Sequence, residues 1–149
     1  MPYISLLFHN TALVAAAVSW VIAQTIKTIL TLVQTKSFEP ERLFGAGGMP
    51  SAHTSSVIAL VMCIAHIRGI SSPEFAIALC FALVVIYDAM GVRRAAGEQA
   101  KVINRMVDIM EKEGSEITEK DLKEYLGHTP LEVLGGILLG IVISLVMIS

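Results

Sequence analysis

Charged side chains are scarce in this sequence of 149 residues: 16% are Asp, Glu, Lys or Arg, where a soluble domain carries about 25%. The formal net charge of −2 leaves no positive excess with which to bind a nucleic acid. A disordered tail is also excluded, because 54% of the residues are hydrophobic and the mean hydropathy is +0.70. The composition indicates a single membrane domain over residues 1–149.

Cysteine is rare as well. Cys63 and Cys80 both lie inside apolar runs, where cysteine is typically a small buried hydrophobic residue. No Cys or His has the spacing of a metal site, so we expect neither a metal nor a cofactor. The N-terminal stretch lacks the basic region and the cleavage site of a signal peptide. We therefore expect residues 1–35 to remain as a membrane segment.

Long apolar runs are abundant instead. A helix needs about 20 apolar residues to cross a bilayer, and four segments approach or reach that length: residues 11–34, 53–67, 73–90 and 130–148. Backbone groups in lipid must be paired within the spanning structure, which makes helices the expected form of these runs. The sequence predicts an all-α bundle of about four transmembrane helices.

Two long connections separate these spans. The connection 36–51 is rich in glycine and is predicted to be irregular. The connection 91–129 has apolar residues at helical spacing, which predicts an amphipathic helix on the membrane surface or docked on the bundle. Those apolar residues are Val102, Ile103, Met106, Val107 and Met110. A shorter polar helix is predicted at residues 118–126.

The positive charges are unevenly distributed among the connections. Four spans place the connections 36–51 and 91–129 on one side of the membrane and the two termini on the other. Nine of the eleven Lys and Arg residues fall in those two connections, and the positive-inside rule then places them in the cytoplasm. We expect an integral protein of the cell membrane whose motif-bearing loops face the cytoplasm.

A polar stripe interrupts the first apolar run, although polar groups inside a membrane are costly unless they face protein or water. Helical spacing places four polar residues on one face: Gln24, Lys27, Thr31 and Gln34. This pattern favours a polar cavity inside the bundle. The alternative is that Lys27 merely extends its ammonium group to the interface.

The segment 47–53, with the sequence Gly-Gly-Met-Pro-Ser-Ala-His, runs directly into the second span. Glycines followed by a helix N-terminus form a site for an anion, because backbone N–H groups point at it. Ser51 either adds a hydroxyl group to this site or caps the helix. His53 is placed to exchange a proton with a bound oxyanion.

Charged residues follow the third span at the same membrane face. Asp88 needs a cation or several hydrogen-bond donors there, and Lys27, Arg93 and Arg94 are the candidate cations. The carboxylate forms either a structural ion pair or part of a catalytic site. Arg93 and Arg94 either bind phosphate oxygens through their planar guanidinium groups or anchor the helix at the interface.

The last span begins with Gly127-His128-Thr129-Pro130-Leu131-Glu132. Thr129, Pro130 and Glu132 match a capping box at a helix start. Alternatively, Glu132 lies one helical turn after His128 and orients its ring, as carboxylates do for catalytic histidines. The sequence leaves both interpretations open.

These motifs together resemble a known superfamily. Pro50-Ser51-Ala52-His53 is similar to the Pro-Ser-Gly-His motif of the type-2 phosphatidic acid phosphatase and vanadium haloperoxidase superfamily. The arginine pair, followed by His128 and Glu132, resembles its Arg…His-x-x-x-Asp motif. Segments 47–53, 88–100 and 126–133 look most like its divergent branch of small bacterial and plant membrane proteins. Here 33 residues separate Arg94 from His128, so we expect an inserted helical excursion that folds back.

The resemblance implies metal-free hydrolysis of a phosphate ester or diphosphate through a phosphohistidine. It implies that His128 is the nucleophile, that Glu132 polarises it, and that His53 protonates the leaving group. The implied ligands of the phosphoryl oxygens are Arg93 or Arg94, Lys27 or Lys36, Ser51, and backbone N–H groups such as that of Gly48.

Three functions fit this sequence. The first is an integral-membrane phosphatase that acts on a lipid phosphate or a prenyl diphosphate. The second is a non-catalytic binder or transporter of lipid phosphate or another anion, with the same ancestry. The third is a structural protein, because Gly136-x-x-x-Gly140 in the last span permits close helix packing or a homodimer. Membrane lipids are the expected partners, and nucleic acid is not.

Overall fold

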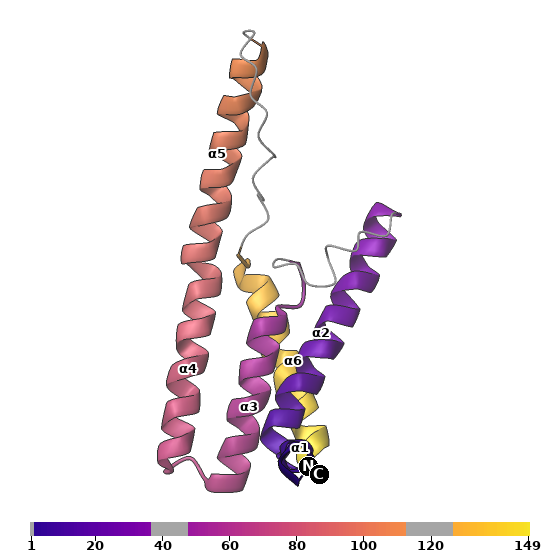
Figure 1. Ribbon diagram of the computed structural model, residues 1–149, viewed down its shortest axis with the longest axis vertical. Coiled ribbons are helices and arrows are strands. Elements are labelled where there is room, and N and C mark those ends of the chain that lie inside the picture. Colours follow the sequence, from indigo (N-terminus) through magenta and orange to yellow (C-terminus); the bar gives the residue numbers. More distant parts are fainter. Residues whose placement is uncertain (1, 37–47, 113–126) are drawn as a thin grey trace.

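The computed structural model describes residues 2–36, 48–112 and 127–149, which form six helices (Figure 1). They are α1 (Pro2–Phe8), α2 (Thr11–Thr35), α3 (Ala52–Arg68), α4 (Pro73–Met90), α5 (Val92–Lys112) and α6 (Pro130–Ile148). No strand occurs within these ranges. The predicted spans coincide with α2, α3, α4 and α6, and the all-α prediction is confirmed.

The helices form a membrane bundle with α3 at its centre. Among the described helices, α2, the α4–α5 segment and α6 are long and apolar enough to cross a membrane, whereas α3 has only 17 residues. The shorter helix packs against α2, α4 and α6. Its buried positions are occupied by small or β-branched side chains, which let the neighbouring backbones approach.

Two glycines bring α6 against α3. A Cβ atom added at Gly136 would lie 2.6 Å from the Ser51 carbonyl oxygen, and one at Gly140 would lie 2.5 Å from that of Ser55. Only glycine allows this approach, because any larger residue would push the helices apart. The Gly-x-x-x-Gly face is thus covered by α3 of the same chain, which is the close helix packing that the sequence permits, and a homodimer through the last helix stays a prediction.

Hydroxyl groups pair where α2 meets α3. The Ser19 and Ser55 hydroxyl groups are both fully buried and hydrogen-bond to each other. Ser56 Oγ donates to the Ala16 carbonyl oxygen at 3.0 Å. These bonds satisfy polar groups that would otherwise be unpaired inside the membrane.

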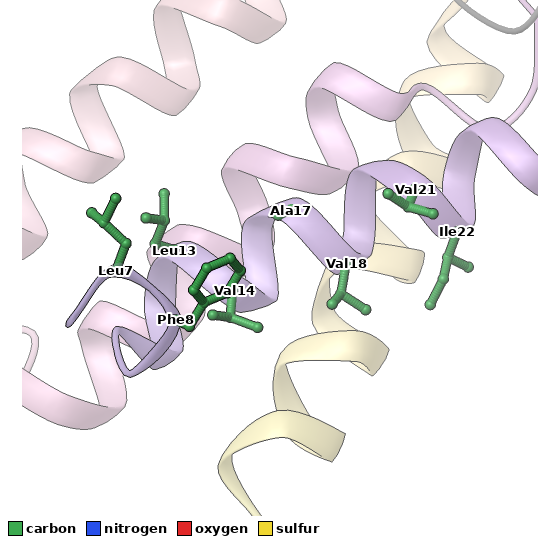
Figure 2. Close-up of a pocket in the computed structure, with 8 residues that line it drawn as sticks. All are labelled: Leu7, Phe8, Leu13, Val14, Ala17, Val18, Val21 and Ile22. Carbon is green, nitrogen blue, oxygen red and sulfur yellow. The ribbon is translucent and has the colours of Figure 1, made fainter. Parts of the chain in front are cut away.

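The two ends of the bundle differ in character. Figure 1 shows both termini at one end, while residues 48–51 and 127–129 lie at the other. The terminal end includes a wholly apolar pocket of about 400 Å³ between α1 and α2 (Figure 2). Its lining contains Leu7, Phe8, Leu13, Val14, Ala17, Val18, Val21 and Ile22. Such a lining offers no polar group that could act on a substrate, and the candidate site lies at the other end of the bundle.

Helix α5 departs from its predicted placement. It continues α4 beyond Gly91 as an almost collinear rod (Figure 1) and contacts no described helix except α4. The amphipathic helix was predicted correctly, but among the described residues it does not dock on the bundle, because α4 is the one helix that it contacts. The polar helix predicted at residues 118–126 lies outside the described residues.

Candidate functional site

The turn before α3 is fixed on two other helices. Gly48 has a φ of +83°, and a Cβ atom there would lie 3.2 Å from Cγ of Lys27, so both conformation and space favour glycine. The Ser51 backbone N–H donates to the Glu132 carbonyl oxygen at 3.0 Å. The turn is therefore held between Lys27 of α2 and the first turn of α6.

The segment before α6 is fixed on the junction between α4 and α5. Gly127 has a φ of +90°, and a Cβ atom there would lie only 2.3 Å from the backbone nitrogen of Arg94. The His128 backbone N–H donates to the Ala89 carbonyl oxygen at 2.8 Å. These contacts confirm that the excursion between Arg94 and His128 folds back. Gly127 and Ala89 lie in the motif segments 126–133 and 88–100, but the sequence assigns neither residue a role in holding His128.

One carboxylate oxygen holds both His128 and the start of α6. Oε2 of Glu132 lies 3.1 Å from Nδ1 of His128, and the Thr129 backbone N–H donates to the same oxygen at 2.9 Å. The Glu132 N–H in turn donates to Thr129 Oγ1 at 3.3 Å, which completes the capping box. Glu132 therefore both caps α6 and contacts the His128 ring, so the structure contains both arrangements that the sequence left open.

The contact with Glu132 determines the tautomer of His128. An ionised carboxylate only accepts hydrogen bonds, so Nδ1 carries the proton and Nε2 keeps its lone pair in the neutral ring. The His128 side chain is 1% exposed. Its Nε2 atom is buried and has no hydrogen-bond partner among the residues that the structure describes.

A second histidine faces this ring. The centres of the His53 and His128 rings are 6.2 Å apart, and the rings are tilted by 58°. His53 is exposed, whereas His128 is buried. The pair therefore combines a solvent-accessible ring with a desolvated one, and an anion bound beside them would contact both.

Two cations accompany the histidines. Lys27 is 3% exposed, and its charge and that of Arg93 act on both rings. Arg93 Nε donates to Asp88 Oδ2 at 2.7 Å, so the expected ion pair of Asp88 forms with this arginine. Asp88 and Arg93 lie on either side of Gly91, and their ion pair spans the junction between α4 and α5.

Burial lowers the pKa of His128 below its ordinary value of 6.5. The hydrogen bond and the negative charge of Glu132 oppose this effect, while the positive charges of Lys27 and Arg93 add to it. Since the pKa is lowered overall, His128 is neutral near pH 7. Together with the tautomer, this leaves a free lone pair on a buried nitrogen.

The other predicted phosphate ligands differ in their burial and in their position in the bundle. Ser51 is fully buried and caps α3, because its Oγ accepts from the Thr54 N–H at 3.3 Å and the Thr54 hydroxyl at 3.0 Å. The Arg94 side chain is exposed. Lys36 is exposed at the end of α2, nine residues and roughly 14 Å beyond Lys27. Of the two lysines, Lys27 is therefore the one at the histidines.

The polar stripe on α2 is divided between the interior and the surface. Gln24 and Lys27 are buried, Thr31 is half-buried and Gln34 is exposed. The predicted inward face is thus confirmed for the two deeper residues, and the prediction for Gln34 is wrong. The stripe continues the site into the bundle by one helical turn below Lys27.

Two other histidines lie away from this site. His66 belongs to the last turn of α3, and His9 follows α1, whose Ser5 carbonyl oxygen lies 2.7 Å from the His9 ring. Within the described ranges, no three His, Cys, Asp or Glu side chains converge as metal ligands do. The expected absence of a metal stays a prediction for a chelator to test.

Comparisons with known proteins bear on the ancestry of the chain. Residues 8–143 match the family model described as the divergent PAP2 family. The chain is also 36% identical to the uncharacterised membrane protein YuiD of Bacillus subtilis strain 168, over 95% of this chain and 96% of that protein. No solved structure matches it significantly.

Proposed function

The chain belongs to the divergent PAP2 family, and from that premise we propose that it is an integral-membrane phosphatase working through a phosphohistidine. The observation that carries this proposal is the environment of His128. One ring nitrogen is held by a carboxylate, while the other is buried, unpartnered among the described residues and close to a second histidine. This environment supports the roles of His128 as nucleophile, Glu132 as its orienting group and His53 as proton donor.

The reaction needs two steps. In the first, the His128 Nε2 lone pair forms a bond to phosphorus, the bond to the leaving oxygen breaks, and protonated His53 gives that oxygen its proton. In the second, His53 accepts a proton from water, whose oxygen attacks the phosphohistidine and breaks the P–N bond. Inorganic phosphate leaves, and both histidines return to their starting protonation states.

Cationic groups around the histidines would bind the phosphoryl oxygens. Lys27 and Arg93 are the nearest candidates, because the charges of both act on both rings. Asp88 would hold Arg93 in place through its ion pair. Ser51, Arg94 and the Gly48 N–H are further candidates. Donors fixed in advance stabilise charge that develops in the transition state, which is often the largest contribution to catalysis.

The position of the site favours a substrate with an apolar tail. The histidines lie at one end of an apolar bundle, where a membrane interface meets its hydrocarbon core. A lipid phosphate or a prenyl diphosphate would keep its tail in the membrane and present its phosphate to the site. A soluble phosphate ester would gain nothing from this placement.

Phosphate release by detergent-purified protein tests the proposal. The substrates are phosphatidic acid, phosphatidylglycerol phosphate, a prenyl diphosphate and a soluble aryl phosphate, all with a chelator present. We expect turnover of a lipid substrate that His128→Ala abolishes and that His66→Ala, the matched control at the other end of the bundle, leaves unchanged. Equal turnover by the native chain and His128→Ala on every substrate would overturn the proposal.

A binder of the same ancestry gives a different result. If the site only binds lipid phosphate, the native chain retains the lipid but releases no phosphate from it. His128→Ala then weakens binding modestly, whereas Lys27→Met weakens it strongly, because the charge that attracts the anion is lost.

We also propose that this site faces the cytoplasm, on the basis of the positive-inside rule. A membrane-impermeant thiol reagent tests this orientation in intact cells. Lys112→Cys at the end of α5 should be protected, and Ser71→Cys between α3 and α4 should be labelled. The reverse pattern would place the site outside.

A further inference from the structure

Helix α5 is the largest feature that the proposed function does not use. Its 21 residues extend about 31 Å beyond α4, and Arg93 and Arg94 lie in its first turn. Eight of those residues are charged, so the helix cannot lie in the hydrocarbon core. Since it continues α4 (Figure 1), it stands off the membrane rather than lying on it.

One side of this helix is apolar and exposed. The side chains of Val92, Val102, Met106 and Ile109 are 63%, 55%, 58% and 50% exposed. No other described helix except α4 contacts α5. Exposed apolar side chains aligned along a helix outside the membrane indicate a surface that another protein segment covers.

The spacing of this surface is that of a coiled coil. Alternating steps of three and four residues connect six positions, which we call the α5 seam: Val92, Ala95, Gln99, Val102, Met106 and Ile109. In heptad notation Val92, Gln99 and Met106 occupy position a, and the other three occupy position d. Such a seam packs knobs-into-holes against a helix of similar pattern.

We propose that the α5 seam pairs with the α5 seam of a second copy of this chain, as a parallel two-stranded coiled coil outside the membrane. Two copies inserted with the same orientation have α5 on the same side of the membrane, and their α5 helices begin at the same distance from the bilayer. Parallel pairing in register therefore needs no rearrangement of the bundle. The membrane itself supplies the alignment.

A single polar residue supports this pairing. Gln99 is exposed at an a position of the seam, where a lone polar side chain fixes the register of a parallel coiled coil at some cost in stability. In register, the two Gln99 amides meet and can hydrogen-bond to each other. Against a wholly apolar partner, the same amide would be buried without a bond.

The charges on α5 are compatible with this pairing. The flanking g positions carry Glu98, Arg105 and Lys112. In a parallel pair they face the e positions of the partner copy, which are Ala96, Ile103 and Met110. No like charges oppose each other along the seam. Lys101 and Asp108 are exposed on the outer side of α5.

Cysteine crosslinking in native membranes tests the inference. The exposed Cys80 is replaced by Ala, and the fully buried Cys63 is kept, since its protection from thiol reagents reports that the bundle is folded. Gln99→Cys lies on the seam, and Lys101→Cys, on the outer side, is the matched control. Mild oxidation forms a disulfide between two cysteines whose Cβ atoms come within about 4.5 Å.

We expect a disulfide-linked dimer from Gln99→Cys and only monomer from Lys101→Cys. Dimer formation at both positions alike, or at neither, overturns the proposal. A band of another mass would indicate a different protein on the seam. A Gln99→Cys thiol that is unreactive without dimerising would indicate coverage by residues 113–126 of the same chain. Both results contradict self-pairing.

A mass measurement in detergent checks the energetics independently. Met106→Asp places a charge in the seam and should weaken the dimer at least tenfold, equivalent to about 1.4 kcal/mol, because an unpaired charge is buried. Asp108→Ala, on the outer side, should leave the dimer unchanged. Equal masses for both variants at all concentrations would contradict the proposal.

Discussion

Glu132 is the most informative residue of the site to mutate, because one of its oxygen atoms contacts two neighbouring groups. Oε2 accepts the His128 ring N–H and also the Thr129 backbone N–H at the start of α6. A change at Glu132 alone cannot separate catalysis from helix capping. Two variants can: Glu132→Gln affects both contacts, whereas Thr129→Ala removes the capping hydroxyl and leaves the carboxylate on the ring.

The expected stability changes are similar. Loss of an N-cap hydroxyl costs about 1 kcal/mol, and loss of a hydrogen bond to a charged acceptor costs about 1.5–3 kcal/mol. The Glu132 side chain is 21% exposed and that of His128 is 1% exposed, so water reaches the contact between them only in part. We therefore expect both variants to fold, with Glu132→Gln slightly the less stable.

The expected activities differ widely. In Glu132→Gln the amide NH₂ can donate to Nδ1, which moves the ring proton to Nε2 and removes the nucleophilic lone pair. Turnover should fall by about 10²–10⁴, by analogy with carboxylate-to-amide changes beside catalytic histidines. Thr129→Ala should keep turnover within about threefold of the native rate, because the carboxylate still orients the ring.

Initial rates of lipid-phosphate hydrolysis, paired with thermal unfolding in detergent, measure both quantities. If Thr129→Ala loses as much turnover as Glu132→Gln at equal stability, Glu132 acts through the helix start alone. If Glu132→Gln retains native turnover, the carboxylate does not set the tautomer. Either result would refute the argument.

Four further predictions follow from the same contacts. Gly127→Ala should reduce turnover at least tenfold in the phosphate-release assay, because the methyl group would clash with the Arg94 backbone at a positive φ and displace His128. Lys27→Met should raise KM at least tenfold while Lys36→Met leaves it unchanged, since only Lys27 adjoins the histidines. Gly140→Ala should destabilise the bundle by about 1–3 kcal/mol in thermal unfolding, because a Cβ atom there meets the Ser55 carbonyl oxygen. Stability should fall as the pH drops below 6.5, because the lowered pKa of His128 makes the unfolded chain the better proton binder, and turnover should fall only once the pH reaches the lowered pKa of His128 in the folded chain.

The fold was largely predictable from the sequence, because hydropathy and capping signals are local. The run beginning at Pro130 and the capping box of Thr129 and Glu132 located α6 without any tertiary information. The role of the Gly136 and Gly140 pair was not predictable in this way. Close packing against a second copy and against α3 require the same small residues, so the sequence alone could not identify the partner helix.

The residues of the site were predictable from the sequence, but the backbone contact that holds His128 was not. His53, His128, Lys27 and Arg93 were all expected at one end of the bundle, and the structure brings them together. The contact of His128 with the Ala89 carbonyl oxygen could not be predicted. Every residue has a backbone carbonyl group, so the residue type does not show which one accepts a hydrogen bond. The direction of α5 was likewise unpredictable, since amphipathicity does not say what covers the apolar side.

Trapping of the covalent intermediate tests the central claim most directly. The native chain, His128→Ala and His66→Ala are incubated briefly with a lipid substrate labelled in its terminal phosphate, quenched in alkali and mapped by mass spectrometry. We expect phosphate on the ring of His128 in the native chain and in His66→Ala, and none in His128→Ala. Release of phosphate by the native chain without any label on His128 would contradict the claim.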